Sequence, residues 1–199
     1  MTNETKPSPQ RSTTTLWILL AISILPFIAA TAYYQFGNFT QFSNNGEILK
    51  SLIDIQSLQL NNEDGQAIER ESLTKKWRMI LIVNKNCDKN CQISLYNMRQ
   101  LNVALGKNYD RFRHMLIHTE NMNKNFTSLL ENKYKETLHA YTSEAVLNKV
   151  FKDTGINIFS NSIYIMDPTG NIMMRFDQNM NPKLILKDLN RLLKVSQIG

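Results

Sequence analysis

The 199-residue chain has only two cysteines and three histidines, which limits the metal sites and covalent chemistry it can support. Their spacing does not give the cysteine–histidine set of a zinc site. The chain also lacks a G-x-x-x-x-G-K phosphate loop and the Ser-His-Asp order of a serine hydrolase. These absences argue against zinc binding, phosphate-loop nucleotide binding and triad hydrolysis.

The chain also lacks clusters of residues with the same charge. The net charge is +6, from 23 lysines and arginines against 17 acids, and the basic residues are scattered among the acidic ones. Nucleic-acid recognition uses clustered basic residues, so we expect no nucleic-acid partner. The mild excess is compatible with a position near anionic lipid head groups or an acidic partner surface.

One long apolar run, residues 16–34, lies near the N-terminus and carries no charge. Its length is that of a membrane-spanning helix, and aromatic residues lie at both of its ends. Lys6 and Arg11 precede it, whereas no lysine or arginine follows until Lys50. The positive-inside rule therefore predicts a cytoplasmic N-terminus.

We accordingly expect a single-pass protein of the bacterial inner membrane. Its parts are a cytoplasmic tail (1–15), a transmembrane helix (16–34), a tether (35–46) and a periplasmic domain (47–199). The alternative is a cleaved signal peptide, because Ala30-Thr31-Ala32 fits a cleavage site. The length of the apolar run favours an anchor over a signal peptide. Both readings place the domain in an oxidising compartment.

The periodicity after the tether predicts alternating strands and helices. A continuous apolar run is typical of a strand buried on both faces of a sheet, and spacing of three or four indicates a helix. Within 126–151 the helical spacing comes in two stretches, one joining Leu129 and Leu130 to Leu138, the other joining Ala145 to Val150. In chain order the pattern gives a hairpin around the turn 61–65, strands at 77–83, 112–118, 162–166 and 172–176, and helices from 91 to 106, within 126–151 and from 182.

This order predicts an α/β protein with a thioredoxin-like fold. We expect a mixed central sheet with flanking helices, an N-terminal hairpin extension and one N-terminal transmembrane helix.

Both cysteines, Cys87 and Cys91, lie between the strand 77–83 and the following helix. The amides and macrodipole at a helix N-terminus favour a thiolate, and Lys85 and Lys89 add positive charge. The pair is therefore predicted to be a redox dithiol or a metal site. The alternative is a structural disulfide, although closing so short a loop removes little chain entropy.

Three segments carry a resemblance to a known group. They are Cys87-x-x-x-Cys91-x-x-x-Leu95-Tyr96-x-Met98-Arg99-Gln100, Asp167-Pro168-x-Gly170-Asn171-x-Met173-Met174-Arg175 and Lys187-Asp-Leu-x-Arg-Leu-Leu-Lys194. The strand opened by Trp77, the CxxxC pair after it and the late hairpin with Tyr164-Ile-Met-Asp-Pro-Thr-Gly-Asn171 resemble the Sco/SenC copper chaperones of cytochrome c oxidase assembly. The three segments resemble more closely a smaller set of anchored thioredoxin-like proteins that are encoded among cytochrome oxidase genes in gammaproteobacteria. The resemblance implies a thioredoxin-like fold, Cu(I) as cargo, and a haem-copper oxidase subunit or its assembly factors as partner.

Two departures concern the copper ligands. Gln92 stands where Sco proteins have proline, and the segment 157–162 contains no histidine where they carry one. Cu(I) is soft and accepts two thiolates, so Cys87 and Cys91 remain its expected ligands. His118 is the expected substitute third ligand, because it ends a predicted strand and strand ends in this fold face the dithiol loop. The other two histidines are weaker candidates.

We therefore expect an assembly factor, with two alternatives. One is a dedicated thiol:disulfide oxidoreductase in which Cys87 attacks and Cys91 resolves the mixed disulfide. The three-residue spacer and the lack of a proline before Ser162 make a general disulfide exchanger less favoured. The other is an oxidase-associated structural protein whose disulfide only holds the loop.

Overall fold

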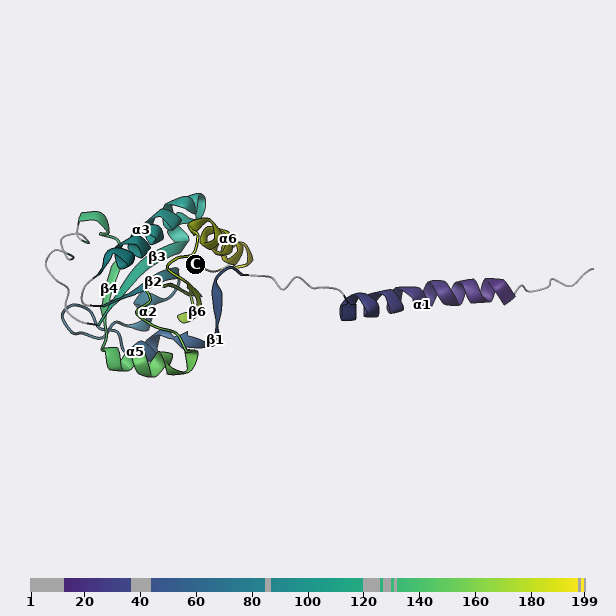
Figure 1. Cartoon of the computed structure of the whole chain (residues 1–199), viewed down its shortest axis with the longest axis horizontal. Helices are drawn as coiled ribbons and strands as arrows, with labels where there is room; N and C mark the ends of the chain where they lie inside the picture. Colours follow the sequence, from purple (N-terminus) through teal and green to yellow (C-terminus); the bar gives the residue numbers. More distant parts are fainter. Residues whose placement is uncertain are drawn as a thin grey trace, which may run out of the picture. The chain divides into compact units, whose positions relative to one another are not determined.

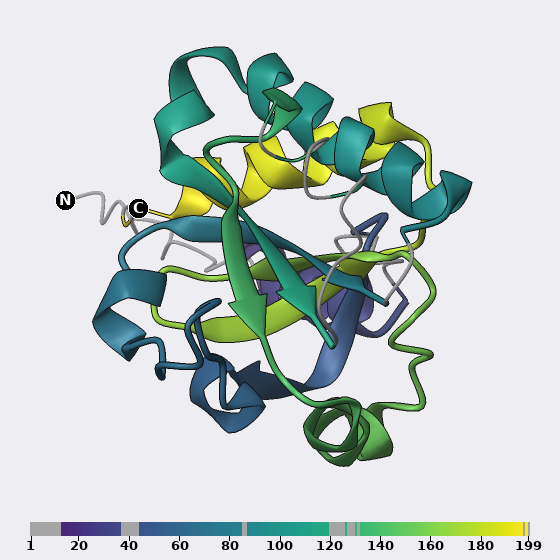
Figure 2. The ribbon, with the colours of Figure 1, turned by 90° about the vertical axis from the view of Figure 1, so that its left-hand side faces the viewer.

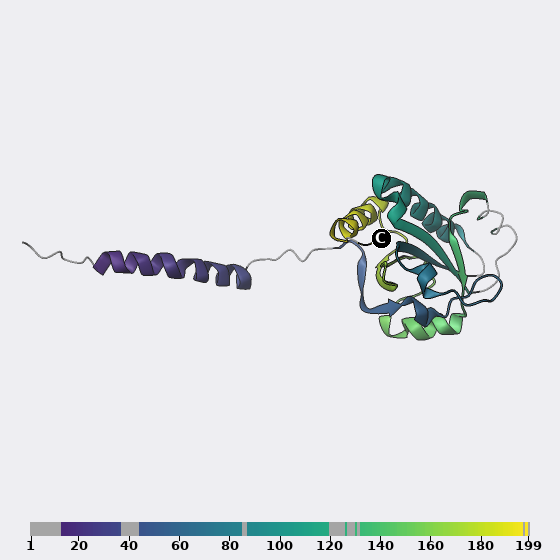
Figure 3. The same cartoon turned by 180° about the vertical axis from the view of Figure 1, so that it is seen from behind.

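The computed structural model describes residues 13–36, 44–84, 87–119, 126, 130, 132–196 and 198 (Figures 1 and 3). The chain divides into two units, Met1–Ser43 and Asn44–Gly199. The first contains α1 (Thr13–Phe36), which is long and apolar enough to cross a membrane. The helix extends past the apolar run at both ends. Residues 1–12 of the expected tail and 37–43 of the expected tether lie outside the described residues.

The second unit is built on a six-stranded mixed sheet in the order β1-β6-β5-β2-β3-β4. Strands β2, β3 and β4 are parallel, whereas β5 runs antiparallel to β2, and β6 and β1 continue the antiparallel half. This arrangement agrees with the predicted mixed α/β sheet. The strands are β1 (Glu47–Asp54), β2 (Trp77–Val83), β3 (Phe112–His118), β4 (Leu138–Tyr141), β5 (Ile163–Met166) and β6 (Asn171–Phe176).

Helices cover both faces of this sheet (Figure 2). On one face α3 (Lys89–Ala104) and α6 (Pro182–Val195) pack on each other and on the sheet, and on the other lies α5 (Glu144–Phe151). We call these the α3 face and the α5 face. The short elements are η1 (Ile55–Leu58), α2 (Arg70–Leu73), η2 (Gly106–Arg111) and η3 (Lys152–Thr154).

All seven residues of β2 are buried, as its continuous apolar run predicts. Because successive side chains of a strand point to opposite faces, β2 contributes to both cores. Met79 and Leu81 pack with α3 residues, and Ile80 and Ile82 pack with residues of the α5 face. The strand that precedes the cysteines is thus fixed from both sides, which makes it a rigid base for the loop after it.

The predicted helix around Leu138 is wrong. Leu138 begins β4, which pairs in parallel with β3 through Met115. Backbone pairing at the open edge of the sheet outweighs the local helical spacing, as tertiary context often does for short segments. Leu129 lies outside the described residues. The second helical stretch is confirmed by α5.

The segment before β2 differs in detail from the expected hairpin extension. Its turn is present, with Gly65 at φ 79° and the amide of Asn62 bonded to the carbonyl of Gln66 at 2.8 Å. The arms, however, meet in a single bridge between Asn61 and Ala67. The longer strand here is β1, which pairs with β6 at the edge of the main sheet.

Candidate functional site

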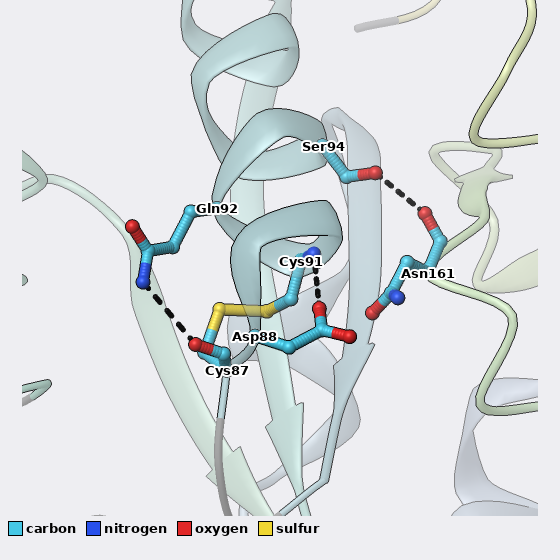
Figure 4. The surroundings of a disulfide bond; sticks show 6 residues. All are labelled: Cys87, Asp88, Cys91, Gln92, Ser94 and Asn161. Carbon is cyan, nitrogen blue, oxygen red and sulfur yellow. Dashed lines mark hydrogen bonds between the residues drawn. A yellow bond between two sulfur atoms is a disulfide. The ribbon is translucent and has the colours of Figure 1, made fainter.

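The two cysteines form a disulfide where the sequence predicts a dithiol (Figure 4). Their Cα atoms lie 5.2 Å apart. Cys91 is in the first turn of α3 and is 2% exposed, whereas Cys87 lies in the loop before the helix and is half-buried. Lys85 lies outside the described residues. A partner therefore has more access to Cys87 than to Cys91.

Asp88 fixes the start of α3 between the cysteines. Its carboxylate accepts a hydrogen bond from the Cys91 amide at 2.8 Å, and its carbonyl accepts one from the Gln92 amide at 3.0 Å. The Gln92 side chain donates to the Cys87 carbonyl at 3.3 Å. An aspartate at this position is a strong N-cap, because it satisfies an amide that has no partner within the helix. The cap holds the loop backbone around the disulfide.

The segment before β5 approaches the same helix. The Ser94 hydroxyl, on α3, donates to the Asn161 carbonyl at 2.6 Å. Asn161 has φ 54°, a left-handed conformation that costs free energy in residues other than glycine and recurs at functional sites. Its side chain points toward Asp88 (Figure 4). No pattern in the sequence pointed to this residue, although asparagine tolerates the left-handed region better than most residues do.

His118 ends β3, as predicted, and its register partner on β2 is Val83. The side chain is 2% exposed and its Nε2 lies 3.1 Å from Nδ1 of His139. The ring of Tyr141 stacks on it with centroids 5.0 Å apart. Burial, with a smaller effect of His139, lowers the pKa of His118 to about 3. The ring is therefore neutral at pH 7, as a metal ligand must be.

Across the described ranges, no three His, Cys, Asp or Glu side chains are grouped so that they could hold one metal ion. The structure thus pairs His118 with His139, and a shared copper site of His118 with Cys87 and Cys91 stays a prediction. The two cysteines are the part of the predicted set that is brought together, by the disulfide. As thiolates, two such sulfurs suit Cu(I).

Comparison with solved structures shows the fold. Yeast Sco1 superposes with a TM-score of 0.56 at 16% identity, covering 74% of this chain and 96% of that chain. A SCO1/SenC family lipoprotein from Bacillus anthracis has a TM-score of 0.53 at 17% identity, covering 73% and 99%. Copper-bound ScoI of Arabidopsis thaliana has a TM-score of 0.53 at 13% identity, covering 76% and 99%. These similarities confirm the predicted thioredoxin-like fold.

A further solved structure is that of BsSco, a member of the Sco family of cytochrome c oxidase assembly proteins in which a disulfide switch has been identified. It has a TM-score of 0.51 at 16% identity and covers 73% of this chain and 96% of that chain. No curated protein matches the chain. A family model described as "Transmembrane-like, thioredoxin-like, C-terminal domain" matches residues 77–196, more than half of the chain. The protein therefore belongs to this family of transmembrane-like, thioredoxin-like C-terminal domains.

Proposed function

We propose that the protein is a membrane-anchored, Sco-like factor that assists assembly of the copper site of cytochrome c oxidase through its Cys87–Cys91 dithiol. The observation that carries this proposal is the position of the cysteine pair, between a fully buried central strand and the capped start of α3. The similarity to the fold of copper-bound ScoI and to BsSco supports it. In this proposal α1 is the anchor, the N-terminus is cytoplasmic and the folded unit is periplasmic.

The chemistry follows from the two states of the sulfur pair. Reduction of the disulfide takes two electrons and two protons and gives two thiols. Cu(I) then binds as cargo to the two thiolates, both thiol protons are released, and the ion leaves when a partner with more or better placed ligands takes it. Oxidation to the disulfide removes both ligands. The redox state of the pair would therefore decide whether cargo is carried.

A second function, exchange of a disulfide with the copper-site cysteines of the oxidase, is favoured by the different exposures of the two sulfurs. The thiolate of the half-buried Cys87 attacks a partner disulfide and releases one partner thiolate. Cys91, which is buried at the helix start, then attacks Cys87 of the mixed disulfide. The products are the Cys87–Cys91 disulfide and a partner dithiol, with two electrons passed to the partner.

Anaerobic titration of the reduced full chain with Cu(I), in competition with a chromophoric chelator, tests the cargo role. We expect one ion at the dithiol, and a loss of affinity of at least about a hundredfold in Cys87→Ser and in Cys91→Ser, because each removes one of two thiolate bonds. Met98→Leu is the matched control, since it removes a buried sulfur from the same helix and leaves the thiols intact. Affinity indifferent to both serine variants would contradict the cargo role.

The dithiol reduction potential separates the exchange function from a structural disulfide. A potential below roughly −300 mV is typical of structural disulfides, whereas exchange needs a higher value. The measurement is equilibration of the full chain with glutathione buffers, followed by alkylation of the free thiols. A value below roughly −300 mV would contradict the exchange function. It would support the third hypothesis, an oxidase-associated structural protein.

A further inference from the structure

The α3 face carries a pair of histidines in addition to the cysteines. Nε2 of His118 and Nδ1 of His139 face each other at 3.1 Å, and the two rings are nearly parallel, with an interplanar angle of 19°. Both histidines lie on neighbouring parallel strands, where Leu116 pairs with His139 and His118 with Tyr141. The pair is therefore held by the register of β3 and β4, which fixes the approach of the two nitrogens.

Strand alternation places this pair on the same side of the sheet as the dithiol helix. In β3, Phe112 and Leu116 pack into the core that contains α3, and His118 follows at the same parity. In β4, Leu138 and Ala140 pack toward the α5 face, so His139 points the other way. Since β2 ends beside His118 and leads into the dithiol loop, the histidine pair and the cysteines lie at the same end of the sheet.

The surroundings keep both rings uncharged and leave one of them accessible. Burial lowers the pKa of His118 to about 3, and it also lowers the pKa of His139, an effect that Glu63 opposes. His118 is 2% exposed, whereas His139 is half-buried. Tyr141 stacks on His118 and lines a cavity of about 360 Å³ together with Glu63 and Thr119. Neither histidine lines this cavity, so an ion would reach the pair through the exposed part of His139.

We propose that His118 and His139 form a second Cu(I) site, separate from Cys87 and Cys91. Each neutral imidazole offers one lone pair, and imidazole nitrogen is a good ligand for copper. Two nitrogens that share an ion at about 2.0 Å lie about 3.3 Å apart for a tetrahedral angle and about 4 Å apart for a linear one. With two ligands only, the near-linear arrangement applies, so the observed 3.1 Å must open by about 0.9 Å when the ion binds.

Binding replaces the hydrogen bond between the rings by two nitrogen–copper bonds. The proton that lies between the rings moves to the remote nitrogen of its own ring through solvent, so both rings stay neutral and no electron is transferred. Cu(I) is favoured over Zn²⁺, because Zn²⁺ requires four ligands and the described residues group no third His, Cys, Asp or Glu with this pair.

The role of this site depends on the proposed cargo function. When Cys87 and Cys91 are joined in the disulfide, they cannot hold Cu(I), whereas the histidine pair is unchanged by their redox state. The site would retain the ion at the same end of the sheet until the dithiol is reduced. The histidine pair would thus store the cargo ion temporarily. It would bind the ion through nitrogen, whereas the dithiol would bind it through sulfur.

The test uses the full chain with Cys87→Ser and Cys91→Ser together, so that binding at the histidines is read without the thiols. Anaerobic Cu(I) competition is expected to give one ion per chain, with at least about a tenfold loss of affinity in His118→Gln and in His139→Gln. His114→Gln is the matched control, because His114 lies on the same strand and face but outside the pair. X-ray absorption is expected to show nitrogen and no sulfur around the ion.

His139→Gln is the decisive variant if His118→Gln fails to fold, since His139 is less buried and lies on the edge strand. Circular dichroism of each variant checks the fold. No Cu(I) uptake by the cysteine-free chain, uptake unaffected by His139→Gln, or uptake of Zn²⁺ in preference to Cu(I) would overturn the assignment. The dithiol proposal is judged separately, on the chain that keeps its cysteines.

Discussion

The two faces of the sheet bury polar groups in different ways. On the α5 face, Arg78 donates to the carbonyls of Ser72 and Leu73 at 2.6 and 2.7 Å, and Thr142 donates to the Leu58 carbonyl at 2.6 Å. The acceptors are backbone carbonyls of neighbouring segments, and they satisfy the buried side-chain donors by direct hydrogen bonds. Arg78 and Thr142 therefore serve stability.

The α3 face also buries reactive and ionisable groups. The face carries the Cys87–Cys91 disulfide, the buried His118, and His114, whose Nε2 has no hydrogen-bond partner among the described residues. Burial lowers the pKa of His114 to about 4, against the opposing effect of a hydrogen bond to the Met98 backbone. A group kept neutral and buried costs stability when it must be protonated. The disulfide and the two histidines with strongly lowered pKa values thus lie on the α3 face, whereas Arg78 and Thr142 on the α5 face are bonded to backbone carbonyls.

The largest expected effect is on pH dependence, and it comes from the α3 face. The pKa values of His118 and His114 in the folded state, about 3 and about 4, lie below the ordinary value of 6.5. Between these values the unfolded chain binds protons that the folded chain does not, so the free energy of unfolding falls as the pH falls. Below pH 6.5 each histidine contributes up to about 1.4 kcal/mol per pH unit until its folded pKa is reached. Urea denaturation from pH 7 to pH 4 measures the slope.

The control for this slope is His114→Gln, which leaves the His118–His139 pair intact. We expect it to reduce the slope by about half, because one of the two strongly shifted groups is removed. Stability that does not change between pH 7 and pH 4 would mean that the two faces do not differ in this respect.

The next effect should come from the α5 face and should be independent of pH. Leu147 is fully buried on α5, and Leu147→Ala is expected to lower the free energy of unfolding by about 3 kcal/mol through lost burial and a cavity. The whole pH curve should shift down with its slope unchanged, and the dithiol reduction potential should stay at its original value. Leu184→Ala is the control, since Leu184 is 41% exposed and should cost far less. A changed potential in Leu147→Ala would show that the faces are coupled.

How far the sequence predicts each region depends on whether the signal is local. The strand 77–83 and the helix after Cys91 could be predicted, because a continuous apolar run and a three-to-four spacing carry their own periodicity. The strand Leu138–Tyr141 could not, since its four residues become a strand only by pairing with β3. The contact of His118 with His139 likewise depends on the register of two strands, and no spacing along the chain encodes it. The N-cap at Asp88 was not predicted, because the apolar spacing begins only at Cys91 and α3 starts two residues earlier.

The smallest effect concerns Asp88 on the α3 face, which has both a structural role as N-cap and an electrostatic effect on the cysteines. Asp88→Ala removes the N-cap of α3 and is expected to cost about 1 kcal/mol of stability, whereas Asp88→Asn keeps a capping side chain and should cost less. The Asp88 carboxylate is a negative charge beside the sulfurs, and such a charge disfavours a thiolate. Because both variants remove it, both should stabilise the reduced form and raise the dithiol reduction potential. Denaturation and glutathione equilibration measure the two quantities. If the potential changes only in Asp88→Ala, the cap geometry controls the cysteines, and the carboxylate charge does not.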